Sequence, residues 1–127
     1  NSASRLESAT KQYGVDLIIS DAVKNRVHDQ FVCRTADLVK VKGKTHPMEV
    51  FTVQGRKGNC DMAAIEIFEN AVRLFRAGSF AEALAEFEKA RAAGLDDGLT
   101  TMYCERCDEM IATPPESWDG VWTMTKK

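Results

Sequence analysis

The spacing of apolar side chains changes along the chain, and each change predicts a different element. In residues 1–13, apolar or small residues recur at helical intervals, at Ala3, Leu6, Ala9 and Tyr13. Residues 15–19 then form a short run with three β-branched residues, between Gly14 and a Ser-Asp pair, which is typical of a buried strand. A short helix capped by Ser20 is predicted over residues 21–29, and its inward side chains are expected to be Ala22, Val23 and Val27.

From Phe31 the apolar period shortens towards two, which predicts a β-hairpin. The alternation is clearest at residues 39–42, where two valines face a core while Lys40 and Lys42 share the other side. A Gly-Lys turn follows, and a return strand is predicted over residues 48–53.

The run from residue 54 to residue 59, Gln-Gly-Arg-Lys-Gly-Asn, has no apolar side chain and interrupts these patterns. After it, Ala, Glu, Phe and Leu recur with helical spacing. We therefore predict a first unit of residues 1–55, a linker at residues 56–60 and a second unit of residues 61–127.

The second unit is predicted to consist of packed helices. The first helix, residues 61–77, ends at Gly78 and carries an apolar stripe of Ile65, Phe68, Ala71, Val72, Leu74 and Phe75. Ser79 and Glu82 form a capping box for the second helix, whose inward side chains are expected to be Phe80, Ala83, Leu84, Phe87 and Ala90. A third helix, residues 96–112, offers this pair the side chains of Leu99, Met102, Tyr103, Cys107, Met110 and Ile111.

Both tryptophans lie in the tail that follows Pro114-Pro115. An indole ring buries about 150 to 250 Å² when it packs, so leaving two of them in water on a chain end is costly. We predict that Trp118 at least folds back onto the helical unit or onto the first unit.

Composition narrows the class of protein. With 44% hydrophobic and 28% charged residues, the 127-residue chain has the balance of a soluble globular protein, and its net charge of −2 gives no global reason to bind nucleic acid or an anionic membrane. No apolar run approaches the roughly 20 residues of a spanning helix. The four cysteines lack the spacing of a secreted scaffold. We expect a cytoplasmic segment with no membrane contact of its own and no nucleic-acid partner.

The first candidate functional residues lie at the start of the chain. Asn1 and Arg5 are four positions apart, so on a helix an amide and a guanidinium share one face. Arg can hold a phosphate with two hydrogen bonds and stays charged near neutral pH. A solvated helix face is the plain alternative for such a pair.

The series Asn1-Ser-Ala-Ser-Arg5-Leu-Glu, the strand Gly-Val-Asp-Leu-Ile-Ile-Ser and the turn Val-Lys42-Gly-Lys occur in this order in the first 55 residues. This order resembles the last part of a class III nucleotidyl cyclase catalytic domain. The resemblance implies an α+β fold: the C-terminal part of a ferredoxin-like cyclase domain, with helix, strand, helix and hairpin, followed by an all-α unit. Because Asn1 falls within a predicted helix, we expect the chain to be the C-terminal section of a longer protein.

The helical unit has its own resemblances. The order Leu74, Gly78, Phe80, Ala83, Phe87, Ala90 resembles the core of one tetratricopeptide repeat, in which small residues allow two helices to approach closely. The ending Pro-Pro-x-x-Trp-Asp-Gly-Val resembles the C-termini of bacterial cyclases that carry such an extension.

The cyclase resemblance implies a role for three residues. Asn1 would orient the ribose of ATP, Arg5 would stabilise the α-phosphate transition state, and Lys42 would contact the β- and γ-phosphates. It also implies Mg²⁺ or Mn²⁺ held by carboxylates upstream of this chain, and a head-to-tail homodimer with active sites in the interface. The chain alone is therefore expected to be inactive. We expect the substrate base to be adenine rather than guanine, and this expectation rests only on how frequent each specificity is in the family.

Other site readings stay open as alternatives. Cys104-x-x-Cys107 could bind zinc, but no second pair of ligands has the spacing of a zinc finger, and buried thiols are the simpler interpretation. His28 is interpreted as a surface residue at a helix end. The basic cluster of Arg34, Lys40, Lys42 and Lys44 is expected to be solvated or to guard a sheet edge unless it serves a ligand.

The alternative function is a non-catalytic interaction module. In that case the cyclase-like piece would only present the helical repeat to a protein partner.

Overall fold

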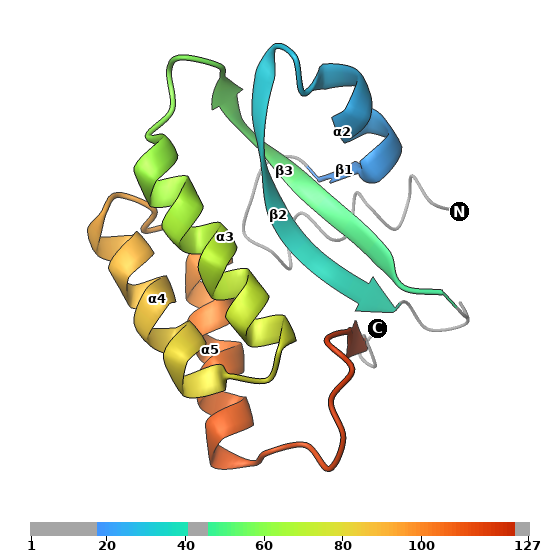
Figure 1. Ribbon diagram of the computed structural model, residues 1–127, viewed down its shortest axis with the longest axis vertical. Coiled ribbons are helices and arrows are strands. Elements are labelled where there is room, and N and C mark those ends of the chain that lie inside the picture. Colours follow the sequence, from blue (N-terminus) through green and yellow to red (C-terminus); the bar gives the residue numbers. More distant parts are fainter. Residues whose placement is uncertain (1–17, 41–45, 124–127) are drawn as a thin grey trace. The chain divides into compact units, whose positions relative to one another are not determined.

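The computed structural model describes residues 18–40 and 46–123, and the fold is α+β. The described chain divides into two compact units (Figure 1). One is a β-sheet unit that extends to Cys60 and also includes the residues from Val121, and the other is a helical unit, Asp61–Gly120. Each unit is described by itself below.

The sheet unit is built on a long antiparallel strand pair (Figure 1). Strands β2 (Phe31–Lys40) and β3 (Met48–Arg56) pair from Phe31 opposite Arg56 to Val39 opposite Met48. This confirms the predicted hairpin. Two short strands, β1 (Ile19–Ser20) and β4 (Trp122–Thr123), complete the described sheet in the order β1-β3-β2-β4.

Strand β3 continues beyond the predicted return strand. Residues 54–56 follow the predicted return strand, and Arg56 is the first residue of the predicted linker, but all three belong to β3. Gly55 pairs with Val32, and Arg56 pairs with Phe31. The prediction failed here because backbone pairing with the start of β2 stabilises this segment, so it needs no apolar side chains of its own.

Helix α2 (Asp21–Val27) begins where the sequence places it, since the backbone N–H of Val23 donates to Ser20 Oγ at 3.3 Å. Its predicted inward face is wrong, because Ala22 is exposed and Val23 is 40% exposed. The helix instead turns Lys24 towards the sheet, with Nζ 4.5 Å from the centre of the Phe51 ring. Lys24 and Val27 are the helical residues that are partly covered.

The helical unit contains α3 (Met62–Arg76), α4 (Phe80–Ala92) and α5 (Gly98–Ala112), as predicted. The side chains of Asp61 and Asp97 cap α3 and α5 by accepting from backbone N–H groups three residues on. Gly78 ends the first helical segment with φ +88°, which favours glycine. The predicted capping box is wrong on one point, because the Ser79 hydroxyl makes no cap hydrogen bond. The ψ angle of Ser79 is 67°, which is not the extended conformation that a cap residue usually has.

Most of the predicted apolar positions form the core of the helical unit. The buried side chains are Ala64, Ile65, Phe68, Ala71, Val72, Phe75, Ala83, Phe87, Ala90, Leu95, Leu99, Tyr103, Cys104, Cys107 and Met110. Ile111 is an exception, because it is 45% exposed near the end of α5. Among the described residues, no helix is long and apolar enough to cross a bilayer.

The tail confirms the prediction for Trp118. Its indole Nε1–H donates to the backbone oxygens of Phe75 and Arg76, each at 3.0 Å, so the ring folds back onto the helical unit. The end of the tail differs from the predicted domain boundary. Trp122 and Thr123, which were assigned to the helical extension, form β4 and pair in parallel with β2 in the sheet.

Candidate functional site

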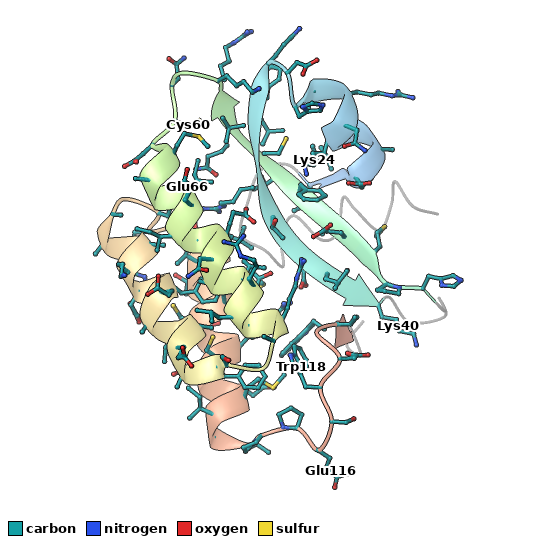
Figure 2. All side chains as sticks on the ribbon, in the orientation of Figure 1. Lys24, Lys40, Cys60, Glu66, Glu116 and Trp118 are labelled. Atoms are coloured by element: carbon teal, nitrogen blue, oxygen red, sulfur yellow. The ribbon has the colours of Figure 1, made fainter. Side chains whose placement is uncertain are left out.

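The three residues that the cyclase resemblance selects, Asn1, Arg5 and Lys42, lie outside the described residues. The structure therefore neither brings them together nor separates them. What it describes is the strand that leads to Lys42. Val39 is buried, whereas Lys40, which is labelled in Figure 2, is exposed. This agrees with the predicted alternation of the two faces up to this point.

The end of β2 is held from both sides. Val39 is paired with Met48 of β3 in one direction and with Trp122 of β4 in the other, and Lys40 is paired with Thr123. A strand with neighbours on both edges has its backbone groups paired and its direction fixed. The described part of β2 is therefore held on both edges up to Lys40, two residues before Lys42 in the sequence.

Two charged residues in the middle of β2 are buried, which the sequence analysis did not foresee. Arg34 has no exposed surface and Asp37 is 2% exposed, so Arg34 is not the solvated or edge-guarding cation that was expected. All four residues from Arg34 to Asp37 are buried, which means that both faces of the strand are covered there. The Leu38 backbone N–H donates to Asp37 Oδ1 at 2.9 Å, beside an irregularity in the strand register.

The sequence carries a weak signal for the burial of these two charged residues. Arg34 and Asp37 have opposite charges and stand in the same strand, and buried charges in proteins are compensated by partners. The pattern of side chains alone does not reveal that residues on both faces of β2 are buried at this point. For this reason the sequence predicts a surface residue at position 34.

Around α2 the charged groups lie at the surface or at its margin. His28 is largely exposed and its Nδ1 is 3.5 Å from Asp29 Oδ1, which confirms the surface interpretation of this histidine. Burial raises the pKa of the Cys33 thiol, and the positive charge of Lys24 opposes this rise. A thiol held in its protonated form is a poor nucleophile, so Cys33 is not an activated cysteine.

Cys104 and Cys107 are buried in α5 as free thiols. Burial raises the pKa of Cys104 to about 11 and that of Cys107 to about 12. Zinc binding would have to displace a proton from each of these thiols, and burial makes this loss less favourable. Within residues 18–40 and 46–123, no three His, Cys, Asp or Glu side chains are grouped as metal ligands. The buried-thiol interpretation is confirmed.

The helical unit has a surface groove of about 340 Å³ between α3 and α4. Its lining combines apolar and acidic side chains, from Asn70, Leu74, Glu82, Ala85 and Glu86. Glu86 is also paired with Lys89, at 3.2 Å between Oε2 and Nζ. A groove lined by both apolar and acidic side chains can accept a basic side chain of a protein partner.

Comparison with known proteins gives one significant relative. The chain is 28% identical over 120 residues to the "Adenylate cyclase, terminal-differentiation specific" of Dictyostelium discoideum, and the match covers 89% of this chain. The chain spans only 6% of that protein's length. No protein-family model matches the chain, and no solved structure matches it significantly.

The alignment supports a relationship to adenylate cyclases. Because the alignment covers 89% of the chain, it must include part of both the sheet unit and the helical unit. The similarity therefore reaches beyond the cyclase-like motifs of the first 55 residues and includes most of the helical extension.

Proposed function

We propose that this chain is the C-terminal section of a class III adenylate cyclase, which converts ATP to cyclic AMP and pyrophosphate. The observation that carries the proposal is the similarity to the Dictyostelium adenylate cyclase over 89% of the chain. The order of motifs in the first 55 residues supports it. The proposal concerns the longer protein to which the chain would belong, since the match spans a small part of the relative.

In the proposed reaction the ribose 3′-oxygen attacks the α-phosphate, and the bond from the α-phosphate to the leaving pyrophosphate breaks. Negative charge develops on the phosphate oxygens, so the protein must supply positive groups that are already in position. Arg5 would hold two oxygens of the α-phosphate, because its fork matches their geometry and it does not lose its proton.

Asn1 and Lys42 would have different tasks. Asn1 can hydrogen bond to the ribose without adding charge. Lys42 offers a compact positive charge for the β- and γ-phosphates. The sequence pattern supports this assignment, because the alternation predicted for residues 39–42 puts Lys42 on the same side as Lys40, which is exposed.

Two Mg²⁺ or Mn²⁺ ions would neutralise the triphosphate, held by carboxylates that precede Asn1 in the longer protein. The described residues offer no cluster that could replace them. We further propose a head-to-tail homodimer of the complete domain, in which each active site combines residues from two subunits. The metal ions and the homodimer both follow from the cyclase assignment, and both are wrong if that assignment is wrong.

The alternative is a non-catalytic interaction module in the cytoplasm, for which the groove between α3 and α4 is the favouring observation. The tetratricopeptide-like helices would then bind a protein partner, and the cyclase-like part would have lost its chemistry. Two aspartates at metal-binding spacing before Asn1 would favour catalysis, whereas their replacement would favour the module.

The direct test is an assay of product formation by the longer protein, with ATP or GTP and Mn²⁺. Cyclic AMP and pyrophosphate should form in equal amounts, whereas the isolated 127-residue chain should form neither. Turnover by the isolated chain would contradict the proposal that the metal-binding carboxylates lie elsewhere. A longer protein that binds ATP and Mn²⁺ without forming a cyclic nucleotide would favour the interaction module.

A further inference from the structure

The helical unit, Asp61–Gly120, carries most of the negative charge of the chain. It holds 13 Asp and Glu residues and 5 Lys and Arg residues, which gives it a net charge of −8, although the net charge of the whole chain is −2. A net charge of this size attracts partners of the opposite sign and repels those of the same sign. The surface of the helical unit therefore favours a basic partner.

The groove between α3 and α4 brings acidic and apolar side chains of this unit together. The two helices pack side by side (Figure 1), and the groove has a volume of about 340 Å³. Ligand pockets typically measure about 300–1,000 Å³, so this groove has room for a side chain rather than for a whole helix. Helix α3 contributes Asn70 and Leu74 to the lining, and α4 contributes Glu82, Ala85 and Glu86.

The two carboxylates of the groove stand about one helical turn apart. Glu82 and Glu86 are four positions apart on α4, so their side chains lie on one face of the helix. Like charges at this spacing repel each other. A cation that contacts both carboxylates removes this repulsion, which makes a positively charged group the favoured occupant of the groove.

One of the two carboxylates already has a partner. Lys89 Nζ lies 3.2 Å from Glu86 Oε2, and the Glu86 side chain is 23% exposed. Glu82 is exposed and forms no ion pair with another described residue. The Lys89 side chain is itself 61% exposed, and ion pairs with so exposed a partner are weak. An arriving cation would therefore meet Glu82 directly and compete with Lys89 for Glu86.

The lining of the groove suits arginine better than lysine. A guanidinium can hold a carboxylate with two hydrogen bonds, and its other N–H groups can donate to a second acceptor such as the Asn70 amide oxygen. A lysine ammonium is a compact point charge that is more strongly hydrated. The apolar stem of an arginine can pack on Leu74 and Ala85.

We propose that the groove between α3 and α4 binds an arginine side chain from a basic segment of a protein partner. Glu82 is the main acceptor, Glu86 is the second, and Lys89 is the internal competitor that the arginine displaces. This names the partner chemistry for the interaction module considered above. It applies equally if the longer protein is a cyclase, because the groove lies wholly within the helical unit.

Binding of a synthetic peptide to the whole 127-residue chain tests the proposal. The probe is a dye-labelled peptide with several Arg and Leu residues among alanines, and a second peptide has Lys at every Arg position. Fluorescence anisotropy should show that the Arg peptide binds about threefold or more tightly than the Lys peptide. Binding of both should weaken as the salt concentration rises, because charges at a surface groove are screened.

Variants of exposed residues test whether the peptide occupies the groove. Glu82→Gln keeps the size of the side chain and removes its charge, so it should weaken binding of the Arg peptide by about tenfold. Glu105→Gln is the matched control, because it removes the same charge from a residue of α5 that does not line the groove. It should change the affinity by less than about twofold. Lys89→Gln removes the competitor for Glu86 and should tighten binding by about threefold.

The outcomes decide between a site and a general attraction of charges. The proposal is overturned if Glu82→Gln and Glu105→Gln weaken binding equally, or if the two peptides bind equally well, because net charge alone would then explain the binding. It is also overturned if the Arg peptide does not bind at low salt, or if Lys89→Gln does not tighten binding. Circular dichroism checks that each variant keeps its helices. No turnover is measured, so a negative result leaves the cyclase assignment untouched.

Discussion

The Tyr103 ring of α5 stacks on the Phe87 ring of α4, with 4.7 Å between ring centres and 14° between ring planes. Tyr103 also meets Phe68 and Phe75 of α3 edge to face, at 5.7 and 5.4 Å. One side chain of the third helix therefore contacts aromatic rings from both preceding helices. This explains how α5 completes a core that a single pair of helices could not bury.

Tyr103→Ala should lower the free energy of unfolding by about 3–5 kcal/mol, the usual cost of removing a buried aromatic ring. Tyr103→Phe is the matched control, since it keeps the stacked ring and removes only the hydroxyl, and it should cost much less. Chemical denaturation followed by circular dichroism measures both. Equal losses in the two variants would mean that the hydroxyl, and not the ring, supplies the stability.

The buried thiols should resist alkylation. With a pKa of about 11, roughly one Cys104 thiol in a thousand is ionised at pH 8, and the fraction is lower for Cys107. Mass spectrometry after a short treatment with iodoacetamide should therefore find modification mainly at the partly exposed Cys60, and more slowly at Cys33, which is also partly exposed but has a pKa raised by burial. Modification of Cys104 or Cys107 as fast as that of Cys60 would show that the helical unit opens readily.

The same thiols predict that stability falls at high pH. A thiol in the unfolded chain ionises near pH 8.5, whereas burial keeps Cys104 and Cys107 protonated up to about pH 11 and 12. Above pH 9 the unfolded state thus binds fewer protons than the folded state, and each buried thiol lowers the free energy of unfolding by up to about 1.4 kcal/mol per pH unit.

Denaturation at pH 8 and pH 10 measures this effect by comparison with Cys107→Ala. At pH 8 the variant should have a lower free energy of unfolding than the unchanged chain. Between pH 8 and pH 10, however, its free energy of unfolding should fall less, because one titrating group has been removed. The same pH dependence in both proteins would show that Cys107 is not protonated differently in the folded and unfolded states.

The sequence predicts the helical unit well because its apolar pattern is local. Phe68 and Phe75 lie two turns apart on one face of α3, and the glycine at position 78 marks the end of the segment. Trp118 is also predictable in outline, because a large ring is costly to leave in water. Its two carbonyl partners are not, since no residue pattern marks the end of a distant helix as an acceptor.

The sheet is less predictable because its strands depend on remote partners. Gln54 to Arg56 and the two residues of β4 carry no strand pattern, and they are strands only because β2 pairs with them. The burial of Arg34 is not predictable from the local pattern, because residues on both faces of β2 are buried at this point. The proposed site residues Asn1, Arg5 and Lys42 come from a resemblance between motifs, and the described residues do not include them.

The central claim is that residues of this chain stabilise the transition state of a cyclase reaction. Arg5→Ala in the longer protein tests it most directly, with Arg5→Lys as the variant that keeps the charge but loses the fork. Since a contact made in the transition state is lost, kcat should fall by about 10² to 10³ while KM for ATP changes little. A kcat unchanged by Arg5→Ala would contradict the assignment.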